Sequence, residues 1–141
     1  MSDTFKQIKR FNDVFGLNRF SRPTGLGVRR LQDFMSILSE ELAEGEEIRD
    51  LYQKIGDESP MREDELEILT EMADWLADLV VYCLSEGYRW GLPMEEVLDA
   101  VMKSNFSKLD DDGKPVFDER GKVLKGKNFV APETMIKGIL K

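Results

Sequence analysis

The sequence predicts an all-α protein, a bundle of four or five helices followed by an irregular C-terminal tail. Apolar residues recur at helical spacing through four long segments, and glycine and proline gather between these segments and in the tail. With 141 residues, 41% of them hydrophobic, the chain can bury one core. We therefore expect a single domain over residues 1–141, with a helical part at 1–109 and a lysine-rich tail at 110–141.

The first predicted helix runs from Thr4 to Phe15, where phenylalanine, isoleucine and valine recur on one face, and Gly16 ends it. Residues 17–27 contain a proline and two glycines, which indicates a connector. The second helix is predicted from Val28 to Ile55, because its apolar residues keep helical spacing over many turns.

Residues 56–60 break the helical pattern, and Asp57 or Ser59 can cap the helix that follows. This third helix is predicted from Met61 to Trp90. Its second half is apolar nearly all round, so we expect it to be central, with Cys83 buried as a small hydrophobe.

After a turn at residues 91–93, a shorter fourth helix is predicted from Met94 to Phe106. The tail is too rich in glycine and proline for a long helix. Residues 116–117 and 123–124 can pair as a small hairpin, and residues 135–140 predict a last turn or two of helix.

Composition excludes several classes of function. The formal net charge of -8 argues against non-specific binding to nucleic acid or to an anionic membrane. Because histidine is absent, histidine-dependent zinc sites and Ser-His-Asp triads are excluded. A single cysteine forms no intramolecular disulfide, and neither a signal peptide nor a membrane span is evident. We expect a soluble cytoplasmic protein.

Two acidic segments mark the second and third predicted helices. In SEELAEGEE, Glu41 and Glu44 share one helical face, with Glu40 close beside Glu44. In EMADWLAD, carboxylates stand three and four residues apart, at Glu71, Asp74 and Asp78. If these helices pack together, they form a carboxylate cage, and a set of ligands made of oxygen alone favours Mg²⁺, or Mn²⁺ in its place.

The pattern EExxE at residues 40–44, followed by ExxD at 71–74, resembles the motif pair of the all-α nucleotide pyrophosphohydrolases. This is the MazG-like superfamily, which includes dimeric dUTPase-like and phosphoribosyl-ATP pyrophosphohydrolase-like members. FNDVFGLNRFSRPT is similar to the family's first helix and connector. The segment SNFSKLDDDGKPVFDERGKVLKGKNFVAPE is similar to the tail of its single-domain members, so the resemblance covers nearly the whole chain.

The resemblance implies a MazG-like helical domain that hydrolyses a nucleoside triphosphate to the monophosphate and pyrophosphate with Mg²⁺, as in house-cleaning of the nucleotide pool. It implies that Glu40 orients or deprotonates the attacking water. The implied metal ligands are Glu41, Glu44, Glu71 and Asp74; the residues implied to bind substrate are Asn105, Lys108, Lys125 and Lys127.

The second motif can be aligned with the family's motif in two ways. Counting by motif gives Glu71 and Asp74, whereas counting back from the Gly91 turn and Asn105 assigns the family's aspartate to Asp78. The second count places Trp75 where a glutamate is expected. All three acids are therefore kept as candidate ligands.

Exposed apolar stripes on helices of this length predict a homodimer or a homotetramer. Two other functions stay open: a non-catalytic acidic helical protein that binds a basic partner, and a pyrophosphohydrolase of a phosphoribosyl nucleotide. The sequence leaves open the base and sugar preference. It also leaves open whether the tail lysines act on their own site or on a neighbour's.

Overall fold

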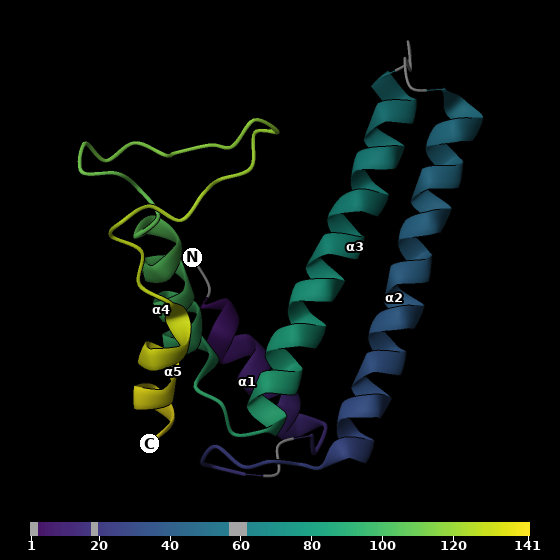
Figure 1. Ribbon diagram of the computed structural model, residues 1–141. Coiled ribbons are helices and arrows are strands. Elements are labelled where there is room, and N and C mark those ends of the chain that lie inside the picture. Colours follow the sequence, from purple (N-terminus) through teal and green to yellow (C-terminus); the bar gives the residue numbers. More distant parts are fainter. Residues whose placement is uncertain (1–2, 18–19, 57–61) are drawn as a thin grey trace.

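The computed structural model of the protein describes residues 3–17, 20–56 and 62–141 (Figure 1). Within these residues the regular structure is helical and no strand is formed, which confirms the all-α class. The predicted caps Asp57 and Ser59 and the predicted start at Met61 lie outside the described residues. The helices are α1 (Thr4–Val14), α2 (Val28–Ile55), α3 (Arg62–Arg89), α4 (Met94–Phe106) and α5 (Pro132–Leu140).

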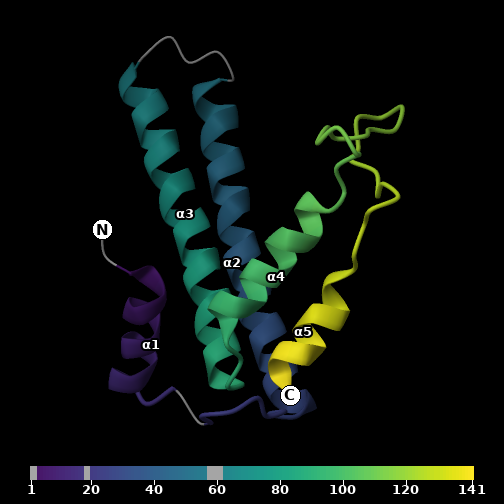
Figure 2. The same ribbon diagram turned by 90° about the vertical axis from the view of Figure 1, so that its left-hand side faces the viewer.

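Helices α2 and α3 lie side by side and antiparallel, and they form the longest feature of the molecule (Figures 1 and 2). Each contains 28 residues, which corresponds to about 42 Å at the usual rise per residue. The first turn of α3 carries Glu63, Asp64 and Glu65, and negative side chains stabilise the positive end of a helix dipole. This hairpin of α2 and α3 is the frame on which the acidic segments are presented.

Helix α1 packs against the C-terminal half of α3. Its N-terminus is capped by Asp3, whose carboxylate accepts a hydrogen bond from the Lys6 amide, and Gly16 follows its last turn with a positive φ of 68°. The fully buried Asn12 donates to the Ser85 carbonyl at 2.9 Å and accepts from the Ser85 hydroxyl at 2.6 Å. Because both polar side chains are satisfied, this pair fixes how α1 sits on α3.

The hydrophobic core is small and lies where α1, α3 and the start of α4 meet. Ile8, Leu84 and Tyr88 form its centre, and Phe5 and Met94 pack against them. The turn after α3 passes so close to the connector that a Cβ on Gly91 would lie 2.0 Å from the Arg22 carbonyl oxygen. The core therefore fixes one end of the α2–α3 hairpin, while the other end extends away from it (Figure 1).

Helices α4 and α5 pack on each other, and the chain between them loops outward on the side of α3 opposite α2 (Figure 1). The predicted hairpin in this loop is reduced to one antiparallel bridge between Phe117 and Val123. Helix α5 begins earlier than predicted, at Pro132, because proline is well suited to the first turn of a helix.

One expectation about burial is wrong. Cys83 is exposed, as are Val80 and Val81 on the same stretch of α3. Helix α3 does contact α1, α2 and α4, but these three neighbours leave part of its apolar circumference uncovered. Among the described residues, no helix combines the length and the apolar character that a membrane crossing requires.

Candidate metal centre

The candidate metal centre lies beside a close contact between α2 and α3. A Cβ on Gly45 would lie 2.6 Å from the Trp75 ring, so the absence of a side chain lets the indole pack against α2. The indole nitrogen of Trp75 donates to the backbone carbonyl of Glu41 at 2.7 Å. Glycine is unfavourable in the middle of a helix, but at position 45 it lets the two helices approach each other.

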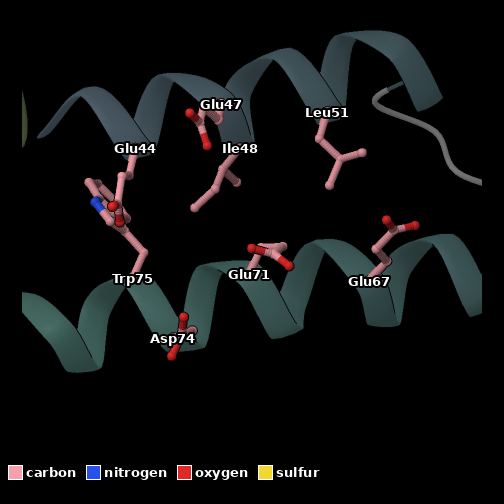
Figure 3. Close-up of a pocket in the computed structure, with 8 residues that line it drawn as sticks. All are labelled: Glu44, Glu47, Ile48, Leu51, Glu67, Glu71, Asp74 and Trp75. Carbon is pink, nitrogen blue, oxygen red and sulfur yellow. The ribbon is translucent and has the colours of Figure 1, made fainter. Parts of the chain in front are cut away.

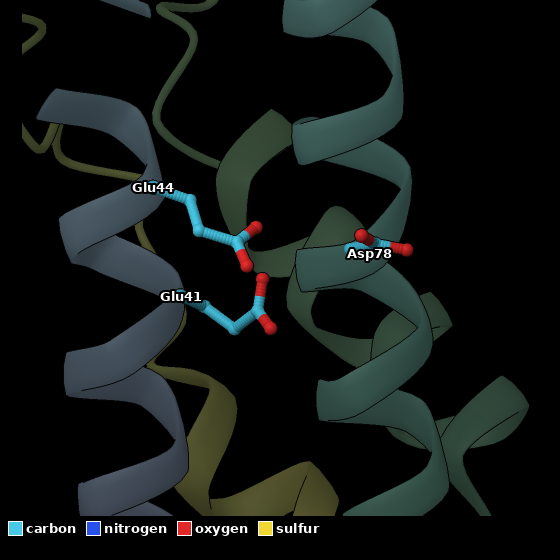
Figure 4. A group of neighbouring side chains, drawn as sticks. All are labelled: Glu41, Glu44 and Asp78. Carbon is cyan, nitrogen blue, oxygen red and sulfur yellow. The ribbon is translucent and has the colours of Figure 1, made fainter. Parts of the chain in front are cut away.

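Glu41, Glu44 and Asp78 come together beside this contact (Figure 4). One carboxylate oxygen from each residue lies within 4.8 Å of the oxygens from the other two. Glu41 and Glu44 are one helical turn apart on α2, and Asp78 faces them from α3. Three oxygen ligands at this separation can hold one hard divalent cation, with water or a ligand completing its coordination.

Glu41 is the most informative member of the cluster because it is buried. Its side chain belongs to a residue that is only 8% exposed, and Oε2 has no hydrogen-bond partner within the part of the chain that the structure describes. A buried carboxylate oxygen without a partner is costly, whereas carboxylates on a solvated helix face are not. A cation among these oxygens removes that cost, so the residues fit a divalent metal ion.

The negative charge of the cluster raises the pKa of one of its own side chains, Glu44, and of a neighbour, Tyr82. The negative charge of Glu41, together with some desolvation and a hydrogen bond between the two side chains, raises the pKa of the exposed Glu44 carboxyl. The same charge raises the pKa of the Tyr82 hydroxyl, one turn beyond Asp78 on α3. Both shifts reflect a concentration of negative charge that a cation at this position would neutralise.

Glu71 and Asp74 do not join this cluster. They line an adjoining groove of about 280 Å³ farther along the hairpin, which shares Glu44 with the cluster and also contains Glu47 and Glu67 (Figure 3). Of the two registers left open by the sequence, the geometry favours the one that uses Asp78. In that register Trp75 stands where the family has a glutamate. Its indole instead donates a hydrogen bond to the backbone of α2.

The other predicted site residues lie outside the three-carboxylate cluster. Glu40 is exposed on α2. Lys108 donates to the Asn105 side chain at 2.9 Å just beyond α4, Lys127 pairs with Asp111, and the Lys125 ammonium lies 5.0 Å from the Phe129 ring centre. The loop that carries the tail lysines extends away from α2 (Figures 1 and 2).

Sequence reasoning missed an ion pair near the cluster. The Arg30 guanidinium donates from Nε to the two carboxylate oxygens of Glu86, at 3.0 and 3.2 Å, and the Trp90 indole donates to Glu86 at 2.7 Å. Burial acts to raise the pKa of Glu86, but these hydrogen bonds outweigh it and the pKa is lowered. A glutamate within the apolar run of α3 indicates that it needs a positively charged partner. The sequence does not identify this partner, because Arg30 is 56 residues away.

No protein-family model matches the chain, and no curated protein matches it.

Proposed function

We propose that the protein is a Mg²⁺-dependent nucleotide pyrophosphohydrolase of the MazG-like type, which converts a nucleoside triphosphate to the monophosphate and pyrophosphate. The observation that carries the proposal is the cluster of Glu41, Glu44 and Asp78, in which one carboxylate oxygen of each residue lies within 4.8 Å of the other two and the buried Glu41 keeps Oε2 without a hydrogen-bond partner among the described residues. The resemblance of the two acidic motifs to those of the pyrophosphohydrolases supplies the reaction.

In this proposal Glu41, Glu44 and Asp78 hold the cation from two helices. Mg²⁺ at this position would neutralise phosphate charge and lower the pKa of a bound water. Three protein oxygens leave part of the coordination of a six-coordinate ion open for substrate phosphates, as is usual for Mg²⁺ in enzymes that act on nucleotides. Glu40, next to Glu41 on α2, is the proposed group that orients the attacking water or accepts its proton.

The non-catalytic alternative is less consistent with these observations. A protein that presents an acidic surface to a basic partner needs solvated carboxylates, and the groove with Glu47, Glu67, Glu71 and Asp74 has that character. It does not need a carboxylate as buried as Glu41, whose desolvation costs stability without adding to an exposed surface.

We also propose that the working unit is a homodimer or homotetramer. The hairpin of α2 and α3 exposes large apolar side chains along both helices, including Leu42 at 66% and Met35 at 59%. Contiguous apolar surface of this kind is uncommon on monomers. A second copy would cover it and can bring the lysines and Asn105 of one chain toward the acidic cluster of another. Sedimentation equilibrium measures the assembly state directly.

Product analysis tests the reaction. Purified protein is incubated with a panel of nucleoside triphosphates and phosphoribosyl nucleotides, with Mg²⁺ or EDTA, and the products are separated by anion-exchange chromatography. The proposal expects monophosphate and pyrophosphate from at least one triphosphate, in the presence of Mg²⁺ only. Release of diphosphate and phosphate, or cleavage of phosphoribosyl nucleotides alone, contradicts it.

A further inference from the structure

The chain between α4 and α5 forms a closed loop, residues 107–131, which we call the arm. Hydrogen bonds close its base: the Ser104 hydroxyl donates to the Val130 carbonyl at 2.8 Å, and the Val130 amide donates to the Ser107 hydroxyl at 2.9 Å. Both views show the arm standing clear of α3 (Figures 1 and 2). The arm is therefore attached to α4 at a fixed base and points away from the α2–α3 hairpin.

Two turns of the same design shape the arm. They begin at Asp110 and Asp118, and each aspartate accepts hydrogen bonds through one carboxylate oxygen from the amides two and four residues later, at 2.8 or 2.9 Å. A glycine with positive φ completes each turn, at Gly113 and Gly121. These bonds give the arm a defined shape although it contains no strand.

The arm exposes apolar side chains. The Leu124 amide donates to the Val116 carbonyl at 2.7 Å, and Phe117 pairs with Val123 in the antiparallel bridge. All four of these side chains are exposed, and Phe117 is the most exposed of them, at 53%. Four apolar side chains held next to one another in solvent are typical of a surface that contacts another protein.

A second apolar surface runs along α3. Exposed apolar residues recur there at alternating intervals of three and four, which is the spacing of a helix that packs along one seam. We call this row the α3 stripe; it consists of Leu66, Leu69, Ala73, Leu76, Val80 and Cys83. Its three leucines are each 47% exposed, so the described part of the chain leaves the stripe uncovered.

Charge indicates which surface can cover the α3 stripe. Residues 62–78 carry seven acidic side chains and one arginine, a formal charge of -6. Two stripes packed on each other would bring these like charges together, which is unfavourable. The tip of the arm, residues 114–125, carries three lysines and one arginine against two acidic side chains, a formal charge of +2. The arm is thus complementary to the stripe in charge as well as in apolar character.

We propose that the arm of one copy of the chain packs its apolar tip on the α3 stripe of a second copy, with its basic side chains beside the acidic ones of α3. Because the fixed base holds the arm away from its own α3, the contact forms between copies. In a two-fold dimer the contact occurs twice, since each copy contributes one arm and one stripe. The inference rests on the proposed homo-oligomer, for which it names the contacting surfaces, and it does not require hydrolysis.

Photo-cross-linking of the full chain locates the contact. Chains that carry p-benzoylphenylalanine at position 117 are mixed with isotope-labelled wild-type chains and left to exchange subunits. After irradiation, mass spectrometry identifies the joined peptides. We expect links from position 117 to labelled peptides from residues 62–83, which only a contact between copies can produce. The same group at position 14, an exposed residue of α1, should give no link to the stripe.

Two variants at one position test the energetic contribution of the contact. Phe117→Asp places a negative charge against an apolar and acidic surface, and it should weaken self-association in sedimentation equilibrium by at least about thirtyfold, the factor that the loss of one dominant interface residue produces. Phe117→Leu keeps an apolar side chain and should retain most of the association. Phe117 is exposed, so neither change should disturb the fold, which circular dichroism verifies.

Several results would overturn the proposal: links from position 117 only within one chain or to other surfaces of the second copy, or a Phe117→Asp variant that associates as tightly as the wild type. If the wild type dimerises in that case, the homo-oligomer stands and only the contact is wrong. A monomeric wild type overturns the contact and the homo-oligomer together. Failure of the proposed reaction is distinct, because the links form whether or not a triphosphate is hydrolysed.

Discussion

The indole nitrogen of Trp75 donates a 2.7 Å hydrogen bond to the backbone carbonyl of Glu41, and this bond joins α3 to α2 at the residue whose buried carboxylate anchors the acidic cluster. The Trp75 ring occupies the space that a side chain at Gly45 would need. The position of the clustered carboxylates along the hairpin therefore depends on a tryptophan and a glycine that carry no charge.

Gly45→Ala should destabilise the protein although alanine favours helix. The added methyl group would lie 2.6 Å from the Trp75 ring, and overpacking of this kind costs about 1–3 kcal/mol. Gly138→Ala in α5 is the matched control, since nothing lies within 4 Å of the added Cβ and the change should stabilise by up to about 1 kcal/mol. Urea denaturation measures both. A neutral or stabilising Gly45→Ala would show that the helices do not approach as described.

Asp78→Asn should weaken Mn²⁺ binding by more than about tenfold, since even the loss of a group that only orients a metal ligand costs about 10- to 100-fold. Asp74→Asn should change the affinity by less than about threefold, because Asp74 lines the neighbouring groove and not the cluster. Isothermal titration calorimetry on the two variants decides between the registers. If Asp74→Asn is the damaging change, the motif count is correct and the cluster of Glu41, Glu44 and Asp78 is not the metal site.

Glu41→Gln should raise the thermal midpoint in EDTA by about 3 °C, the shift that roughly 1 kcal/mol produces in a domain of this size, because it removes a buried charge from beside Glu44. The same variant should lose the further rise that Mn²⁺ produces in the wild type. Glu46→Gln, on an exposed position of α2, should leave both midpoints unchanged. A lower midpoint for Glu41→Gln in EDTA would mean that the charge is already compensated.

Because Arg30 and Glu86 form an ion pair, we expect the stability of the protein to decrease at acidic pH. The folded-state pKa of Glu86 lies below its ordinary value of 4.5, so its contribution to stability is present above pH 4.5 and is lost as the pH falls through the lowered pKa. Glu86→Gln should cost about 1.5–3 kcal/mol at neutral pH. Below pH 4.5, the stability of the variant should fall less steeply than that of the wild type. Parallel curves in urea denaturation across this range would contradict the assigned pair.

The fold follows from the sequence to the extent that it depends on local patterns. The 3.6-residue spacing of apolar residues predicts the observed bounds of α2 and places the end of α3 within one residue. The start of α5 at Pro132 and the exposure of Cys83 depend on what packs nearby, and local spacing carries no such information.

The candidate site is predictable only in part, for a related reason. Spacing places Glu41 and Glu44 on one face of α2, but it does not fix how far α3 is shifted along α2. Asp74 and Asp78 share a face of α3 one turn apart, so this shift decides which of them lies beside Glu41, and the packing of Trp75 on Gly45 fixes it. The partnership of Arg30 and Glu86 spans 56 residues and has no local signature.

The central claim is that Glu41, Glu44 and Asp78 hold a divalent cation that supports hydrolysis of a nucleoside triphosphate. The most direct test is the rate of pyrophosphate release for the wild type, Glu41→Gln and Glu46→Gln, each with Mg²⁺ and with EDTA. We expect Mg²⁺-dependent release by the wild type and by Glu46→Gln, and a loss of at least about a hundredfold in Glu41→Gln, the scale of removing one key electrostatic contact in an active site. Equal rates for Glu41→Gln and the wild type, or no release by a folded wild-type protein from any triphosphate, would contradict the claim.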